Sequence, residues 1–162
     1  MNAISRPTVS RLPDNLEYVD APYVIGRLEK AGQTLIALPG TGTRPAAYRV
    51  MWPEFWTAVE DMAAAEKTRY PVPSAAAITA MDEAFRWIEL IPLASIRTRQ
   101  LILLRLLVQP ISDKHVWSWR KLEGRFGMGK DALILRHGRG IGRIVTLLNM
   151  PDFIPLPGES LP

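Results

Sequence analysis

The segment from Trp117 to Asn149 constrains the fold most, because its apolar residues fit two helices joined by a short turn. In the first helix Leu122 and Phe126 are expected to face inward. Gly127 follows where the chain has to turn, and glycine adopts a positive φ at little steric cost. Two helices in this arrangement are typical of a helix-turn-helix. The further residues expected to face inward recur at helical spacing and are Met128, Leu133, Ile141, Ile144, Val145 and Leu148.

The rest of the sequence also fits helices, which prolines separate. Helical spacing of apolar residues predicts a helix over 22–38 and a second over 53–66. A third is predicted from an N-cap at Ser74 to about 90, and a leucine-rich fourth over about 94–108. The stretch AYRVMW is the only short candidate for a strand. The sequence therefore predicts an all-α fold, with a helical N-terminal subdomain followed by a C-terminal helix-turn-helix.

These helices and their flanking segments divide the chain into four predicted parts. The two ends are rich in proline and lack a helical pattern. The expected parts are a disordered arm over 1–21, a helical subdomain over 22–92, a helix-turn-helix DNA-binding region over 93–149, and a proline-rich tail over 150–162.

Basic side chains concentrate near the C-terminal end of the chain. Residues 96–149 contain eleven lysines and arginines and three acidic residues, a local charge of +8, whereas the whole protein carries +4. A cationic segment that coincides with a helix-turn-helix pattern indicates a polyanionic partner. The alternative is a solvated basic surface that has no partner.

The helix-turn-helix pattern assigns roles to individual residues. The N-terminal part of the second helix lies where base edges are reachable, and basic residues around it are placed for phosphate contacts. The candidate residues near base edges are Lys130, Asp131, Ile134 and Leu135. The candidate phosphate contacts are Arg120, Lys121, Arg125, Arg136, Arg139 and Arg143.

Several residues depart from the usual pattern. Glu123 stands where close packing favours a small residue, and Gly129 is a weaker N-cap than serine or threonine. Ile134 and Leu135 are apolar where polar base readers are common. Glycines at 138, 140 and 142 lower helix propensity, so the second helix is expected to kink or fray after His137. The alternative is a helical hairpin that only packs or dimerises.

No set of residues predicts an enzyme, a cofactor or a metal site. The stretch GRFGMGKD places Asp131 where a phosphate-binding loop needs serine or threonine. His115 and His137 have no acid at metal-ligand spacing, so each is expected to be exposed or to contact phosphate. Structural roles are predicted for the remaining candidates: Trp52, Trp56 and Trp87 in the core, and Asp82 and Glu83 in salt bridges to Arg86.

The composition of the chain indicates the cellular compartment in which the protein is expected. The chain has no cysteine, no apolar run near the ~20 residues that span a bilayer, and no apolar stretch in MNAISRPTVSRLPDN that fits a signal peptide. We therefore expect a cytoplasmic protein that does not contact a membrane.

Two blocks of sequence carry a resemblance to a known family. Trp52–Glu54 and Met81–Trp87 are its most specific parts, and the match covers roughly residues 22–149. The chain resembles a small uncharacterised family of bacterial and prophage proteins with a C-terminal helix-turn-helix similar to region four of sigma factors. The resemblance implies an all-α fold and DNA binding, without catalytic residues.

The expected function is thus binding of duplex DNA by a transcription regulator of a phage or mobile element. RNA polymerase and a second copy of the chain are the further expected partners. Two alternatives remain: a DNA-packaging adaptor similar to phage small terminase, and a helical protein-binding adaptor that does not bind nucleic acid.

Overall fold

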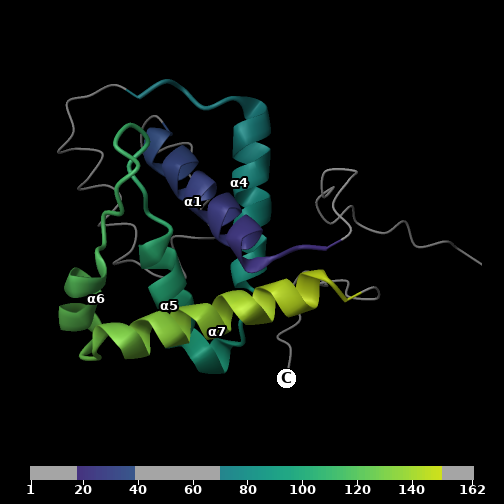
Figure 1. The fold of residues 1–162 in the computed structure, drawn as a ribbon. Helices are drawn as coiled ribbons and strands as arrows, with labels where there is room; N and C mark the ends of the chain where they lie inside the picture. The colour runs from purple at the N-terminus through teal and green to yellow at the C-terminus, as the bar shows by residue number, and fades with distance from the viewer. Residues whose placement is uncertain (1–17, 39–69, 151–162) are drawn as a thin grey trace, which may run out of the picture.

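The computed structural model describes residues 18–38 and 70–150, and these residues are all-α (Figure 1). Residues 1–17 of the predicted arm, Trp52, the predicted helix over 53–66 with Trp56, and the tail from 151 lie outside the described residues. The last residues of the predicted arm are described, and they are ordered: Val19 is buried and Ala21 begins a helix. The described helices are α1 (Ala21–Ala37), α4 (Ala75–Ile88), α5 (Ile96–Arg105), α6 (Trp119–Phe126) and α7 (Lys130–Leu148), and a 3-10 turn, η1 (Leu93–Ser95), precedes α5.

Side-chain caps fix where α1 and α4 begin. Asp20 Oδ1 accepts a hydrogen bond from the backbone N–H of Tyr23 at 2.8 Å, and Pro22 stands in the first turn of α1. Ser74, the predicted N-cap, accepts from the backbone N–H of Ala77 at 3.1 Å. Each cap satisfies a donor that a helix start otherwise leaves unpaired.

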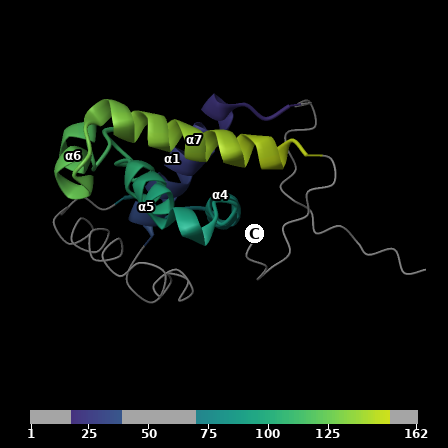
Figure 2. The ribbon, with the colours of Figure 1, turned by 90° about the horizontal axis from the view of Figure 1, so that it is seen from below.

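One hydrophobic core joins all the described helices. α1 packs against both α4 and α7, and α7 also packs against α5 and α6. Figure 2 shows α7 along one side of the molecule, with α5 against its inner face. Buried side chains of α1 such as Leu28 belong to the same cluster as Ile141 and Ile144 of α7. The described parts of the predicted N-terminal subdomain and of the helix-turn-helix region therefore share a core.

An ion pair and two aromatic rings connect α1 to α4. Arg27 Nη2 lies 3.2 Å from Glu83 Oε2, and the guanidinium also covers the rings of Tyr23 and Trp87. Burial is the main reason why the pKa of Glu83 is raised, and the Arg27 charge opposes that rise. Trp87 is buried as predicted. Glu83 forms its ion pair with Arg27 of another helix, and the charge of Arg86, the partner indicated by sequence spacing, also acts to lower the pKa of Glu83.

Asn149, the first residue after α7, is hydrogen-bonded to the chain just before α1. Asn149 Oδ1 accepts from the backbone N–H of Val19, and its Nδ2 donates to the carbonyl of Val19, both at 2.8 Å. Two hydrogen bonds to one residue fix the amide orientation of Asn149. They hold the C-terminal end of α7 beside the start of α1.

Close helix contacts depend on two glycines. A Cβ on Gly32 of α1 would lie 2.0 Å from the carbonyl oxygen of Leu106, and one on Gly140 of α7 would lie 2.7 Å from methyl groups of Thr98 and Ile102. The expected kink or fraying after His137 is wrong, because α7 is one continuous helix. Packing on α5 at Gly140 offsets the low helix propensity of the glycines there.

A hairpin-like loop connects α5 to α6. Val108 and His115 face each other in an isolated antiparallel β-bridge. Next to it, the N–H of Val116 donates to the carbonyl of Leu107 at 2.9 Å. Asp113 turns the chain with a positive φ of 54°, which aspartate tolerates better than most residues. Gln33 of α1 donates to the Asp113 carboxylate at 2.6 Å and so attaches the loop to α1.

Candidate nucleic-acid interface

α6 and α7 form the two-helix unit that the sequence predicts. Gly127 ends α6 in the left-handed conformation, with φ 63° and ψ 33°, and its N–H donates to the carbonyl of Glu123 at 2.9 Å. Leu122, Phe126 and Leu133 are buried, and Met128 packs against them from the turn. The predicted inward residues of this unit are therefore confirmed, Leu148 being partly buried at the far end of α7.

Glu123 caps the start of α7 from the preceding helix. Its Oε1 accepts a hydrogen bond from the backbone N–H of Lys130 at 2.6 Å, whereas Gly129, the N-cap residue, has no side chain that could accept one. A carboxylate at this end of a helix is also favoured by the helix dipole. Glu123 therefore supplies the cap that Gly129 lacks. The sequence pattern did not predict this role, because the only sign of it is an acidic residue seven positions before the first residue of α7.

We expect Glu123→Ala to lower the free energy of unfolding by about 1 kcal/mol, because a helix loses its N-terminal cap. Glu123→Gln keeps an oxygen acceptor at the same position and should retain most of the stability. Urea denaturation of the three proteins measures the difference. Equal midpoints for the wild type and Glu123→Ala would contradict a capping role.

The predicted contact residues lie almost entirely at the surface. Arg136 is half-buried. The other nine are exposed, namely Arg120, Lys121, Arg125, Lys130, Asp131, Ile134, Leu135, Arg139 and Arg143. These nine side chains of α6 and α7 are therefore accessible to solvent, and Arg136 is partly accessible.

Some arginines of this basic segment donate hydrogen bonds to backbone carbonyls within the fold. Arg97 donates to the carbonyl of Phe126 at 3.0 Å, at the C-terminal end of α6. Arg143 Nε donates to the carbonyl of Leu90 at 3.0 Å, just after α4, and Arg99 donates to the carbonyls of Glu89 and Ile91. Cations at helix C-termini are favoured by unpaired carbonyls and by the helix dipole. Arg143, a predicted phosphate contact, therefore also has a structural bond.

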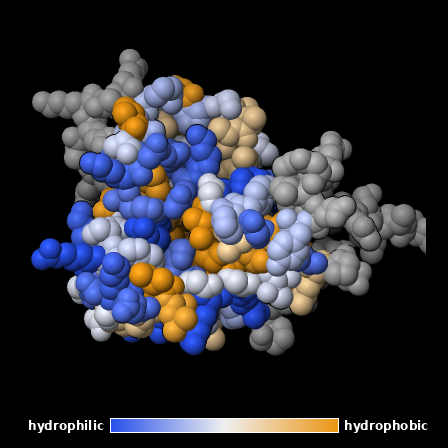
Figure 3. Space-filling model, viewed as in Figure 1, coloured by the Kyte–Doolittle hydropathy of each residue, from blue (hydrophilic) through white to orange (hydrophobic). Residues whose placement is uncertain are grey.

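The exposed face of α7 is uneven in chemistry. Leu135 is 56 % exposed and Ile134 is 41 % exposed, and Figure 3 shows an apolar patch among hydrophilic side chains over the beginning of this helix. Gly138 and Gly142 follow on the solvent side, where a Cβ would meet nothing. Arg136, Arg139 and Arg143, spaced by three and four residues, form a stripe along one flank.

A stack of Arg105, Trp119 and His137 attaches the two-helix unit to α5. The Arg105 guanidinium lies 4.5 Å from the centre of the Trp119 ring, and the His137 ring meets that tryptophan edge-on at 5.7 Å. Arg105 also donates to the carbonyl of Trp117 at 2.9 Å. Burial first, and then the charges of Arg105 and His115, lower the pKa of His137 to about 4.

The expectation that both histidines are exposed or contact phosphate is therefore wrong for the described structure. His137 is half-buried against Trp119. His115 is half-buried as well: its Nδ1–H donates to the carbonyl of Arg105 at 2.9 Å, and its Nε2 lies 3.3 Å from Glu29 Oε1. His137 joins α7 to α6, and His115 joins the loop before α6 to Glu29 of α1, contacts that spacing alone could not indicate.

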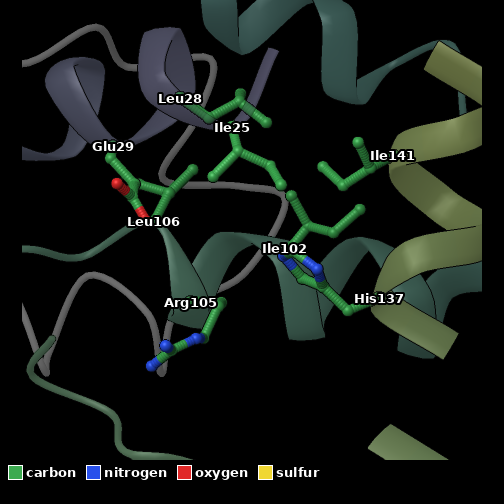
Figure 4. Close-up of a pocket in the computed structure, with 8 residues that line it drawn as sticks. All are labelled: Ile25, Leu28, Glu29, Ile102, Arg105, Leu106, His137 and Ile141. Atoms are coloured by element: carbon green, nitrogen blue, oxygen red, sulfur yellow. The ribbon is translucent and has the colours of Figure 1, made fainter. Parts of the chain in front are cut away.

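A small cleft lies between α1, α5 and α7 (Figure 4). Its internal volume is about 10 Å³, which is room for about one water. Pockets that enclose a substrate are typically tens of times larger. Its lining residues are Ile25, Leu28, Glu29, Ile102, Arg105, Leu106, His137 and Ile141.

Residues 18–38 and 70–150 contain neither a metal-binding cluster nor a membrane-spanning helix. No group of histidine, aspartate and glutamate side chains there could hold a metal ion. No helix in those ranges combines the length and the apolar character that crossing a membrane requires.

The described residues are thus all-α, and their last two helices, α6 and α7, are joined by a turn at Gly127. Residues 37–144 match the family described as a domain of unknown function, DUF6362, and the chain belongs to this family. No curated protein and no solved structure matches the chain.

Proposed function

We propose that this protein binds duplex DNA through α6 and α7, with α7 directed at the major groove. The observation that carries the proposal is the form of the unit: a short helix, a left-handed glycine turn and a second helix whose N-terminal half is exposed. A helix-turn-helix meets DNA with this half of its second helix. The similarity to region four of sigma factors is part of the same proposal.

The charges around the unit fit a phosphate backbone. Arg120, Lys130 and Arg139 are exposed and stand on both helices. The carboxylate of Glu123 is bonded to the start of α7, which leaves Asp131 as the other acidic side chain of the unit. Cations on such a surface bind DNA by releasing its condensed counterions.

The biological role that fits this binding is regulation of transcription by a phage or mobile-element protein, with RNA polymerase or a second copy of the chain as partner. A DNA-packaging adaptor similar to small terminase would use the same surface in a ring of subunits. The mass of the protein in solution separates the two, because a ring contains many copies and a regulator forms a monomer or dimer.

We expect apparent affinity for a random-sequence duplex to fall steeply between about 50 and 200 mM salt. Arg139→Ala should weaken binding to all duplexes alike and reduce the slope of log affinity against log salt by about 1. Arg86→Ala is the matched control, since Arg86 is an exposed arginine on α4. Fluorescence anisotropy of a labelled duplex measures both quantities.

The same titrations contain the result that would overturn the proposal. Binding that does not change with salt, or equal slopes for the wild type and Arg139→Ala, would place the contact elsewhere. The second candidate, a protein-binding adaptor, would then be favoured by the exposed Ile134 and Leu135.

A further inference from the structure

After Lys130, the exposed residues in the first turns of α7 provide little capacity to donate hydrogen bonds. Between Asp131 and Leu135 the helix presents a carboxylate, which only accepts hydrogen bonds from bases, and then apolar side chains. Leu135 follows Asp131 by one helical turn, so the two stand on the same stripe of the helix. Leu135 is 56 % exposed, and the stripe continues through Gly138 and Gly142, which add no side chain around it.

We infer that this face of α7 reads the C5 methyl group of thymine in the major groove, with Leu135 as the principal contact and Ile134 beside it. The inference rests on the proposed binding of duplex DNA. Of the groups that the four base pairs present in the major groove, the thymine methyl is the apolar one. A leucine side chain can bury that methyl but cannot satisfy a base donor or acceptor.

The surroundings of the patch favour DNA over an apolar protein partner. Lys130, Arg136 and Arg139 lie within the same turns of the helix and supply the positive charge that a phosphate backbone requires. A stable protein interface buries about 800 Å² on each partner. The large apolar residues exposed on this part of α7 are the neighbouring Ile134 and Leu135, which suits contact with one or two methyl groups.

The experiment compares thymine with deoxyuridine, which lacks only the methyl group. The full chain selects duplexes from a random library, and a selected duplex is then resynthesised with deoxyuridine at each thymine in turn. Wild type, Leu135→Ala and Leu93→Ala are titrated against each duplex. Leu93 is the matched control, because it is a leucine of η1 that is 57 % exposed and lies outside α6 and α7.

The wild type should lose about fourfold in affinity for each contacted methyl that is removed. Leu93→Ala should show the same loss. Leu135→Ala should bind the thymine and deoxyuridine duplexes equally, because the side chain that buries the methyl is gone. Alanine keeps a high helix propensity, so this exposed substitution leaves α7 intact.

Two results would overturn the inference in different ways. Equal binding of thymine and deoxyuridine duplexes by the wild type, with the salt dependence retained, would refute methyl recognition and leave the proposed DNA binding in place. An oligomer of the wild type that dissociates in Leu135→Ala, measured by light scattering, would show that this leucine contacts a second copy. Absence of binding to every duplex would instead remove the proposed function itself.

Discussion

Replacing Gly32 by alanine is expected to lower the free energy of unfolding by about 2–3 kcal/mol, the upper part of the range for an overpacked core. The added Cβ would lie 2.0 Å from the carbonyl oxygen of Leu106, far inside van der Waals contact. That oxygen belongs to the backbone at the end of α5, so it cannot turn aside as a side chain would. The contact between α1 and the end of α5 has to open.

Gly26 provides the control for this prediction on the same helix. A Cβ at Gly26 meets nothing within 4 Å, so alanine there should raise the unfolding free energy by about 1 kcal/mol through helix propensity alone. Urea denaturation measures both variants. Changes of the same sign at the two positions would show that α1 does not approach Leu106 as described.

Acidification from about pH 7 to pH 5 is expected to remove about 2 kcal/mol of stability through His137 alone. The pKa of His137 is about 4 in the folded chain, whereas an unfolded histidine has a pKa of about 6.5. The unfolded chain therefore binds the proton more readily in this window. Stability from the neutral ring is fully present above the unfolded pKa and is lost as the pH falls toward the folded one.

His137→Phe isolates that contribution, because phenylalanine keeps an aromatic ring against Trp119 and does not titrate. The unfolding free energies of wild type and variant are measured by urea denaturation at both pH values. The difference between the two proteins should change by about 2 kcal/mol in favour of the variant at the lower pH. A difference that is the same at pH 7 and pH 5 would mean that His137 is not held neutral by its surroundings.

Features set by residues close in sequence could be predicted. The Ser74 cap, the turn at Gly127 and the inward residues from Leu122 to Val145 follow from helical spacing and from the conformational preferences of single residues. Exposure of Lys130, Ile134 and Leu135 follows from the same spacing. Each of these depends on neighbours within one or two turns of helix.

Features set by distant residues could not be predicted. Glu83 pairs with Arg27, which lies 56 positions earlier, and Arg143 bonds to the carbonyl of Leu90. α7 stays continuous through its glycines, and α5 packs against it at Gly140, a contact that helix propensity does not predict. Such partners depend on how the helices pack against one another, and sequence spacing does not contain that information.

α7 is fastened at both extremities. Its first residue is bonded to Glu123, and the residue after its last turn is bonded twice to Val19. α7 therefore cannot rotate about its helix axis without breaking the hydrogen bonds at one of its ends. A duplex that docks on α7 would meet a face whose angular setting is fixed beforehand, and adjustment would fall to the long arginine side chains and to the DNA. Such preorganisation lowers the ordering cost of association.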